Sequence, residues 1–254
     1  MSVVIERAGQ VLILTIDRPE ARNAVNGAVA RGIEQAIDQL EGDDDLQVGI
    51  LAGAPPVFCA GADLKDVHDR RSSGSVTERG GFGGLVSRSR TKPLIAAVDG
   101  PALAGGTELV LATDLVVASR RAVFGIPEVK RSLVAGAGGL FRLARKIPQN
   151  VAMELALTGD PLSAGRAAEL GLVNHLVDDG HVVEAALALA ERITANAPLA
   201  VRESRRVVLA STLLADEEAQ AVSDEAVRTI TSTTDFREGV AAFVEKRAPR
   251  WTAT

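Results

Sequence analysis

The spacing of hydrophobic residues changes along the chain, and each spacing predicts a different kind of element. Short runs rich in β-branched and other apolar residues occur in Val3–Glu6 and Val11–Asp17, on either side of a turn at Ala8–Gln10, which predicts two short strands. Apolar residues then recur at the three- and four-residue spacing of a helix. They are Val29, Ile33, Ile37 and Leu40. A helix is therefore expected over about 26–41.

Continuous apolar runs further along the chain predict buried strands. They are Val48–Ala52, Leu94–Val98, Leu115–Ala118 and Ala122–Phe124. Helices are expected at about 106–113 and 139–146, and helical stripes dominate after residue 150. A glycine- and arginine-rich segment at about 68–84 lacks apolar periodicity and is expected to be a long loop.

These elements predict an α/β protein in two parts. Strand–strand–helix units are expected over residues 1–195, and a C-terminal helical region over 196–254. The helical region is expected to cover the core or to pack on a neighbouring subunit.

Composition narrows the classes of function. A chain of 254 residues that is 46% hydrophobic can bury a sizeable core. A net charge of −5 and an aromatic content of 3% argue against a nucleic-acid surface, which relies on cations and stacking. No apolar run approaches the roughly 20 residues of a membrane span. With a single cysteine, Cys59, and no signal-peptide pattern, a cytoplasmic protein is expected.

The segment Phe58–Lys65 is the first candidate for chemistry. It runs from an apolar strand through small residues into the expected start of a helix. Small side chains let a ligand approach the backbone, and N–H groups at a helix start are free to face an anion. Taken alone, the segment is equally well explained as a simple strand-to-helix turn with Asp63 as its cap.

A second turn of this kind lies at Asp99–Glu108. Gly105 and Gly106 precede a helix that begins with Thr107 and Glu108. Two N–H donors that converge on one carbonyl oxygen form an oxyanion hole, which stabilises an enolate. Alternatively, the glycine pair serves helix–strand packing, and Glu108 is a surface acid that complements the helix dipole. The apolar neighbours of Glu108 favour burial and a perturbed pKa.

A second carboxylate, Glu128, follows a proline. Pro127 fixes the direction in which the chain enters Glu128. An isolated Pro-Glu pair beside Lys130 and Arg131 is more typical of an exposed glutamate. The turn at Gly136–Gly139 opens the next helix and presents backbone groups to a ligand or to water. Together these segments predict an oxyanion hole with a paired acid and base.

Other kinds of site have no support in the sequence. The three histidines lack metal-ligand spacing, and one cysteine cannot supply a zinc set. No nucleophile elbow marks a Ser-His-Asp triad. Gly80–Gly84 lacks the lysine and the hydroxyl of a nucleotide-binding loop. A metal or nucleotide-hydrolysing role is therefore not expected.

In this order, the segments resemble those of the crotonase superfamily, the enoyl-CoA hydratase/isomerase family. The resemblance spans nearly the whole chain and rests on the ordered set rather than on one motif. The set begins at Asp17–Ala24, which is similar to the family's early Arg-Pro…Asn-Ala element, and closes at Glu238–Arg247, similar to its last helix. Between them lie Phe58–Lys65, Gly100–Asp114, Phe124–Glu128 and Gly136–Gly139.

The resemblance implies a crotonase-like spiral of ββα units with a C-terminal helical region, assembled as a homotrimer or a dimer of trimers. It also implies roles for individual residues. The N–H groups of Ala62 and Gly105 would hold a thioester oxygen. Glu108 and Glu128 match the two hydratase glutamates, and Gly136 matches a backbone position near the attacking water.

Coenzyme A is implied as part of the thioester substrate, with no permanently bound cofactor and no metal. Ala60 would offer its carbonyl to the adenine amine. The other residues assigned to the coenzyme A path are Ala24, Asp63, Leu64, Lys65, Phe243 and Lys246. In the family, the last helix sometimes approaches coenzyme A from a neighbouring subunit.

One departure from the family pattern is Ala104, which replaces the first glycine of a triple-glycine run and should be tolerated because Gly105 is kept. The leading interpretation is reversible hydration of a trans-2-enoyl-CoA to a 3-hydroxyacyl-CoA. The alternatives are a Δ3,Δ2-enoyl-CoA isomerase and a non-catalytic acyl-CoA-binding protein. RNA binding is a further alternative, which the pI of 5.4 disfavours. The sequence does not predict which acyl group the substrate carries.

Overall fold

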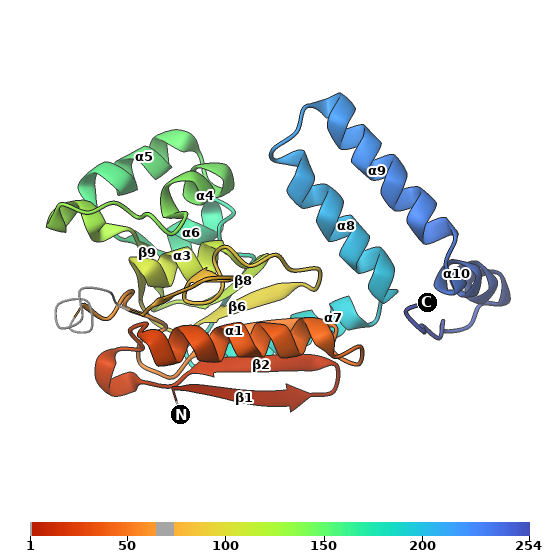
Figure 1. The fold of residues 1–254 in the computed structure, drawn as a ribbon, viewed down its shortest axis with the longest axis horizontal. Coiled ribbons are helices and arrows are strands. Elements are labelled where there is room, and N and C mark those ends of the chain that lie inside the picture. Colours follow the sequence, from red (N-terminus) through yellow and green to blue (C-terminus); the bar gives the residue numbers. More distant parts are fainter. Residues whose placement is uncertain (1, 65–73) are drawn as a thin grey trace.

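The computed structural model describes residues 2–64 and 74–254 of the chain. Within this part, the largest sheet has the strand order β1-β2-β3-β6-β8-β11 (Figure 1). β1 is antiparallel to β2, and each later pair is parallel. The strands are β1 (Val3–Ala8), β2 (Val11–Ile16), β3 (Val48–Gly53), β6 (Leu94–Val98), β8 (Leu115–Ser119) and β11 (His175–Val177).

A helix covers each face of this sheet. α1 (Gly27–Gly42) packs against β1, β2 and β3, and α7 (Val182–Thr194) packs against β3, β6 and β8. Leu12 belongs to the core cluster that includes α1, whereas Ile13 belongs to the cluster that includes Ala186 of α7. Successive strand residues point to opposite faces, so the sequence pattern decides which residues meet which helix.

Smaller elements surround the sheet. A second sheet has the order β10-β9-β7, and β4 pairs with β5 in a hairpin. These strands are β4 (Val76–Thr77), β5 (Gly81–Phe82), β7 (Ala102–Leu103), β9 (Val123–Gly125) and β10 (Leu162–Ser163). The short helices are η1 (Pro19–Ala21), α3 (Gly105–Leu111), η2 (Pro127–Arg131), α4 (Gly139–Lys146), α5 (Gln149–Thr158) and α6 (Ala164–Glu169).

Two sequence-based expectations are corrected. The chain after residue 150 is not wholly helical, because β10 pairs with β9 and β11 joins the main sheet beside β8. Strands of two or three residues are too short to show a period-two pattern. The expected loop at 68–84 contains the β4–β5 hairpin, while its residues up to 73 lie outside the described part of the chain.

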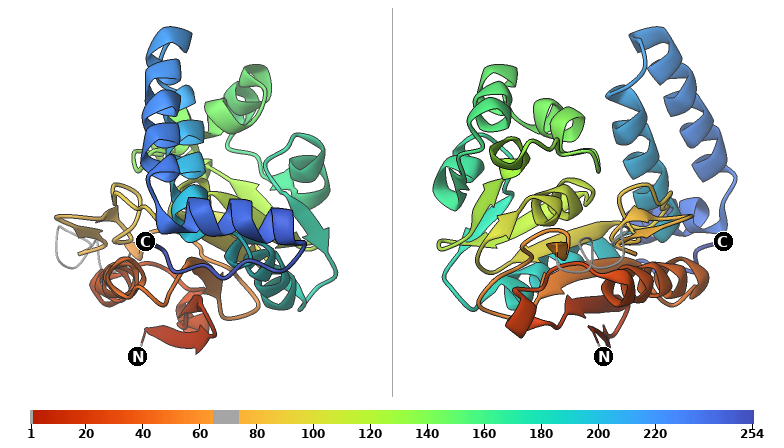
Figure 2. Two further views of the ribbon diagram at one scale, coloured as in Figure 1. Left: turned by 90° about the vertical axis from the view of Figure 1, so that its right-hand side faces the viewer. Right: turned by 60° about the vertical axis from the view of Figure 1, so that its left-hand side comes forward.

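After α7, the chain forms an arm that we call the C-terminal arm. It consists of α8 (Pro198–Ser211), α9 (Asp216–Thr231) and α10 (Thr234–Glu245). α8 and α9 lie side by side and stand apart from α4 and α5 (Figures 1 and 2). The predicted division between 1–195 and 196–254 falls between α7 and α8, and it stays a prediction. No helix in the described residues is both long and apolar enough to cross a bilayer.

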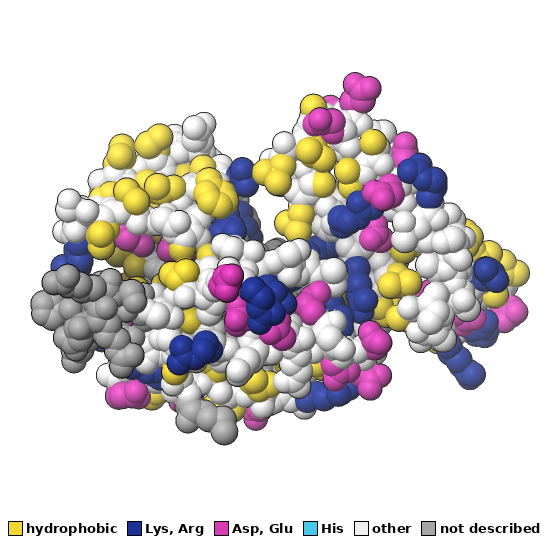
Figure 3. Space-filling model, in the orientation of Figure 1, with side chains coloured by type: hydrophobic (Ala, Val, Ile, Leu, Met, Phe, Trp, Pro, Cys, Tyr) yellow, Lys and Arg dark blue, Asp and Glu magenta, His cyan; other side chains and the backbone are white. Residues whose placement is uncertain are grey.

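The C-terminal arm exposes many apolar side chains. The space-filling view shows a hollow between the arm and the body, with hydrophobic side chains on both of its sides (Figure 3). The exposed apolar residues of the whole arm include Val208, Leu209, Leu213, Leu214, Val227, Val240, Phe243 and Val244. In α8, Pro198 is the buried residue. The arm therefore contributes little to the apolar core of its own chain.

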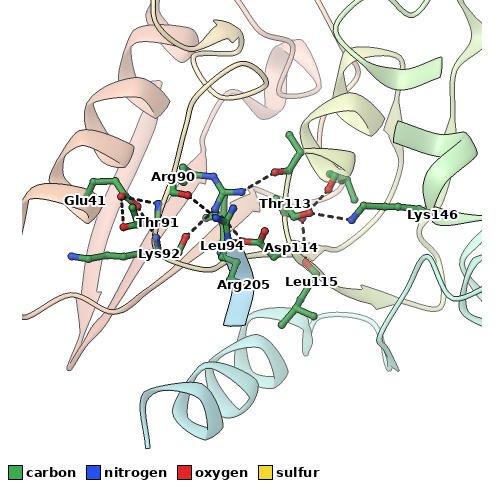
Figure 4. A network of polar contacts seen from close by, with 12 residues as sticks. Glu41, Arg90, Thr91, Lys92, Leu94, Thr113, Asp114, Leu115, Lys146 and Arg205 are labelled. Atoms are coloured by element: carbon green, nitrogen blue, oxygen red, sulfur yellow. Dashed lines mark hydrogen bonds and ion pairs between the residues drawn. The ribbon is translucent and has the colours of Figure 1, made fainter. Parts of the chain in front are cut away.

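Buried polar contacts join the C-terminal arm to the body (Figure 4). Asp114 lies 3.1 Å from Arg90 and 3.0 Å from Arg205 of α8, and it accepts the Leu94 N–H at 2.8 Å. Burial alone would raise the pKa of Asp114, but these partners outweigh it and hold the pKa below its usual range. The junction of arm and body is thus organised around one partly buried carboxylate.

Candidate active site

The two small-residue turns predicted from the sequence lie side by side. Leu103 N–H donates to the Cys59 carbonyl at 3.0 Å, and Cys59 N–H donates to the Pro101 carbonyl at 3.2 Å. Gly106 packs directly over this contact, since a Cβ built there would lie 2.1 Å from the Cys59 oxygen. The lack of a side chain at Gly106 therefore allows the turns to meet.

In the described part of the chain, each turn includes a backbone N–H group at the cavity that donates no hydrogen bond. Around the first turn, Val25 N–H donates to Gly61 O at 2.8 Å and Asp63 N–H donates to Val25 O at 2.9 Å. Within the described residues, neither Ala62 N–H nor Gly105 N–H donates a hydrogen bond. The turns are close here, because a Cβ built at Gly61 would lie 3.1 Å from the Gly105 nitrogen. Two neighbouring free donors are what an oxyanion hole requires.

Ala104 adopts a backbone conformation that favours glycine. Its φ is 52° and its ψ is −126°. A non-glycine residue in such a region costs about 1–3 kcal/mol and persists when its surroundings hold it there. Ala104 N–H donates to Gly125 O at 2.8 Å, and Ala104 O accepts the Glu108 N–H at 3.2 Å. The turn thus keeps a glycine-like geometry although alanine stands at this position.

Glu108 is buried, and the turn at Gly136–Gly139 holds its carboxylate. Glu108 lies in the first turn of α3 and is 4% exposed. Its Oε1 accepts the Gly139 N–H at 2.9 Å. Burial, reinforced by the Glu128 carboxylate and opposed by the Gly139 N–H, raises the pKa of Glu108. The alternative of a surface acid is therefore wrong.

Glu128 is half-buried in η2 and has an unsatisfied oxygen. Within the described residues, its Oε2 is shielded from solvent and has no hydrogen-bond partner. Burial raises the pKa of this carboxyl group. Neighbouring Lys130 pairs with Asp160 at 2.7 Å and not with Glu128. A buried oxygen of this kind is costly unless water or a ligand bonds to it.

The predicted catalytic residues line one cavity of 1380 Å³. They are Ala62, Gly105, Glu108, Glu128 and Gly136. The volume exceeds the roughly 300–1,000 Å³ of a typical small-ligand pocket, so there is room for a long substrate. Within residues 2–64 and 74–254, no group of three or more His, Cys, Asp or Glu is placed to hold a metal ion.

The residues assigned to the coenzyme A path divide into three groups. Four of them line the same cavity: Ala24, Ala60, Asp63 and Leu64. Lys65 lies outside the described residues. Phe243 and Lys246 do not line this cavity, and Phe243 is 85% exposed on α10. A contribution of these last two residues to the site of a neighbouring subunit stays a prediction.

Comparison with known proteins establishes the family. The sequence profile described as enoyl-CoA hydratase/isomerase matches residues 6–254. The chain belongs to the enoyl-CoA hydratase/isomerase family. It is 42% identical to enoyl-CoA hydratase EchA19 of Mycobacterium tuberculosis, a match that covers 98% of this chain and 95% of that protein.

Two further comparisons define the fold and the range of relatives. A crystal structure of an enoyl-CoA hydratase from Mycobacterium tuberculosis H37Rv superposes with a TM-score of 0.96 at 53% identity, covering 100% of this chain and 99% of that one. This family member therefore has the crotonase fold. Mevalonyl-coenzyme A hydratase sidH of Aspergillus fumigatus is 39% identical over 95% of this chain and 91% of that protein.

In this member of the enoyl-CoA hydratase/isomerase family, the early Arg-Pro…Asn-Ala element supports the cavity wall. Asn23 is fully buried, and its side-chain amide donates to two carbonyls of the 54–57 loop at 2.7 and 2.6 Å. Arg18 lies 3.2 Å from Asp63 and donates to the Ala24 carbonyl at 2.7 Å. The sequence analysis identified this element but assigned no role to Arg18 or Asn23.

Two side chains of the cavity wall were missed. Phe82 follows the hairpin turn, and its ring packs on Gly105, where an added Cβ would lie 2.4 Å from the ring. The sequence did offer a signal for Phe82, because it is one of few aromatic residues in the chain and lies within a run of glycines. Arg142 reaches the cavity from α4, one helical turn after Gly139. No motif in the sequence marks it.

Proposed function

We propose that this protein catalyses the reversible addition of water to a trans-2-enoyl-CoA, which gives a 3-hydroxyacyl-CoA. One observation carries the proposal. Two unengaged backbone N–H groups and two carboxyl groups with raised pKa values, Glu108 and Glu128, line a single cavity. The hydratases among the relatives support a thioester substrate.

The backbone donors act on the thioester. Hydroxide from water bonds to the β-carbon, the double bond opens, and negative charge builds on the thioester oxygen. The N–H groups of Ala62 and Gly105 hold that oxygen and stabilise the enolate. In other enzymes, one such donor contributes roughly 3 kcal/mol to the transition state.

The carboxyl groups move the protons. Glu108 and Glu128 hold the water, take one proton from it and deliver a proton to the α-carbon, so that the elements of water add across the double bond. Positioned acid and base groups typically contribute about 10²–10⁴-fold each. The Glu128 carboxylate contributes to the raised pKa of Glu108. Gly136 presents its backbone to the attacking water.

Coenzyme A enters as part of the substrate, without a permanently bound cofactor. Ala24, Asp63 and Leu64 contact the coenzyme, and the Ala60 carbonyl accepts a hydrogen bond from the adenine amine. These four residues line the same cavity as the glutamates, which supports the assignment. Lys65, Phe243 and Lys246 complete the path, the last two from a neighbouring subunit.

A panel of enoyl-CoA thioesters, followed by the loss of conjugated-thioester absorbance, tests the proposed function. At least one trans-2-enoyl-CoA should be hydrated, and the preferred chain identifies the acyl group. Conversion of 3-enoyl-CoA to 2-enoyl-CoA without a hydrated product would identify an isomerase. Tight acyl-CoA binding without any turnover would identify a non-catalytic binding protein.

We also propose that the protein is cytoplasmic and assembles as a homotrimer or a dimer of trimers through the C-terminal arm. The exposed apolar side chains of the arm support this role. Sedimentation of the wild-type protein should give three or six chains. The double substitution V208E and L213E should lower the assembled fraction, because it places charge within that apolar surface. A monomeric wild-type protein would contradict the assembly.

A further inference from the structure

Arg142 bridges two segments that lie far apart in the sequence. It sits on the second turn of α4, and its Nη1 donates to the Ala137 carbonyl at 3.0 Å. Its Nη2 donates to the Val86 carbonyl, 56 residues earlier in the chain. A planar guanidinium can make two such bonds in fixed directions, which a lysine ammonium cannot reproduce.

The first of these contacts fixes the turn that binds Glu108. Gly139 N–H donates to Glu108 Oε1 at 2.9 Å, and Ala137 N–H also stabilises that carboxylate. Gly138 lies between them with a φ of 101°, and a Cβ built on it would lie 2.1 Å from Arg142 Nη1. The space left by the missing side chain is thus filled by the guanidinium.

The second contact reaches a different segment of the cavity wall. Val86 lines the cavity and follows Phe82, whose ring packs on Gly105. Arg142 therefore ties the wall beside one proposed oxyanion donor to the turn beside Glu108. A shift of either segment would change the distance between the donor and the acid/base group.

The charge of Arg142 also acts on Glu108. Two ionisable groups face this carboxyl group: Glu128 from η2, which raises its pKa, and Arg142 from α4, which lowers it. Arg142 itself faces Arg145 on its own helix and Arg90 from the body. An arginine keeps its proton in proteins, so the Glu108 carboxylate has a permanent cation near it.

We propose that Arg142 is a positioning residue, which orients Glu108 through the 137–139 turn and ties that turn to the cavity wall at Val86. The kinetic consequence rests on the proposed hydratase function, whereas the effect on Glu108 ionisation does not. Nothing in the family assignment or in the comparisons gives Arg142 this role.

Infrared titration and steady-state kinetics of three variants test the proposal. The carboxyl band that disappears in Glu108→Gln reports the ionisation of Glu108 directly, without turnover. In Arg142→Met, this band should persist to higher pH than in the wild type, because the neighbouring cation is lost. The kcat should fall by about 10- to 100-fold, as expected for a misplaced reacting group, with a smaller change in KM.

The other two variants separate charge from geometry. Arg142→Lys should keep the Glu108 titration near the wild-type pH but should still lower kcat, because the two carbonyls lose their planar partner. Arg145→Met is the matched control. Arg145 is exposed one turn further along α4 and stacks on Phe141 at 5.1 Å, so its loss should change neither quantity.

Two results would overturn the proposal. One is an unchanged Glu108 titration in Arg142→Met, and the other is a wild-type kcat in both Arg142 variants. If Arg142→Met does not fold, wild-type kcat in Arg142→Lys alone overturns the positioning role. An inactive wild-type protein would refute the proposed hydratase function, yet the infrared comparison would still decide whether Arg142 acts on Glu108.

Discussion

The cavity and the junction of the C-terminal arm both bury carboxyl groups, but their pKa values move in opposite directions. In the cavity, Glu108 and Glu128 have raised pKa values because burial is not fully compensated. At the junction, Asp114 lies between Arg90 and Arg205, and its pKa is lowered despite burial. The difference shows that the facing charges, rather than burial alone, decide whether a buried carboxyl group is ionised.

This contrast matches the role that we propose for each region. A carboxyl group with two cationic partners, such as Asp114, stays ionised and serves as a structural anchor. A carboxyl group with a raised pKa keeps its proton more readily than an ordinary one, so it can serve as the acid as well as the base in acid/base catalysis. The predictions below test this distinction, from the largest expected effect to the smallest.

Removing the ionisable group from the cavity should have the largest effect. Glu108→Gln and Glu128→Gln should each lower kcat by about 10²–10⁴-fold, the usual contribution of a positioned acid or base. Acyl-CoA binding, measured by calorimetry, should persist. Glu217→Gln on α9, an exposed acid of the arm, is the matched control and should keep wild-type turnover. Near-wild-type hydration by both cavity variants would refute the proposed acid/base pair.

Breaking the anchor should affect stability. Asp114→Asn leaves the buried Arg90 without its counter-charge, which should lower the free energy of unfolding by about 3–5 kcal/mol. Urea denaturation at fixed protein concentration measures this. Asp178→Asn removes an exposed pair with Arg120, 3.2 Å apart, and should cost about 0–1 kcal/mol. Equal losses in the two variants would show that Asp114 is no anchor.

The anchor also predicts a pH dependence. The pKa of Asp114 is lower in the folded than in the unfolded chain, so its stabilisation is present above the ordinary value of 3.8 and is lost as pH falls through the folded value. The stability difference between wild type and Asp114→Asn should therefore shrink as the solution is acidified. A difference that stays constant with pH would contradict the charge argument.

Within the cavity, removing one acid should change the ionisation of the other. The Glu128 carboxylate raises the pKa of Glu108, so Glu128→Gln should move the infrared titration of Glu108 to lower pH. This shift is opposite in sign to that expected for Arg142→Met. Glu217→Gln again serves as the control. An absent or upward shift in Glu128→Gln would contradict the expected repulsion between the two carboxylates.

The smallest effect concerns the backbone of the second turn. Ala104→Gly should raise the free energy of unfolding by about 1 kcal/mol, because glycine adopts a φ of 52° without strain. Ala221→Gly in the interior of α9 is the matched control and should lower stability by roughly 0.5–1 kcal/mol. Thermal denaturation shows whether each substitution raises or lowers the stability. Destabilisation by both substitutions would argue against strain at Ala104.

Much of the fold could be predicted because its signals are local. The helix expected at 26–41 is α1 (Gly27–Gly42), and the run Leu94–Val98 is β6. Both follow from apolar spacing within a few turns of chain. β11 was missed because its three residues carry no period, and it is held in place by pairing with β8, more than fifty residues earlier.

The candidate site was predicted less completely. The small residues of the two turns pointed to backbone chemistry, and the structure places Ala62 and Gly105 in one cavity. The exposed-glutamate interpretation of Glu128 was reasonable for an isolated Pro-Glu pair. The structure argues otherwise, because Glu128 lines the cavity and its Oε2 is buried without a hydrogen-bond partner among the described residues. Arg142 carried no signal, because its partners lie on other segments.

The sequence by itself determined longer elements such as α1 and β6, and the two turns whose small residues expose the backbone. These properties depend on neighbours a few positions away. Tertiary structure decided which carboxyl groups have a raised pKa and which has a lowered one. That choice depends on charges and N–H groups delivered from distant segments: Gly139 to Glu108, and Arg205 to Asp114. No local sequence pattern predicts contacts between segments that lie so far apart in the chain. The difference in pKa between the cavity and the junction therefore arises only when the chain is folded.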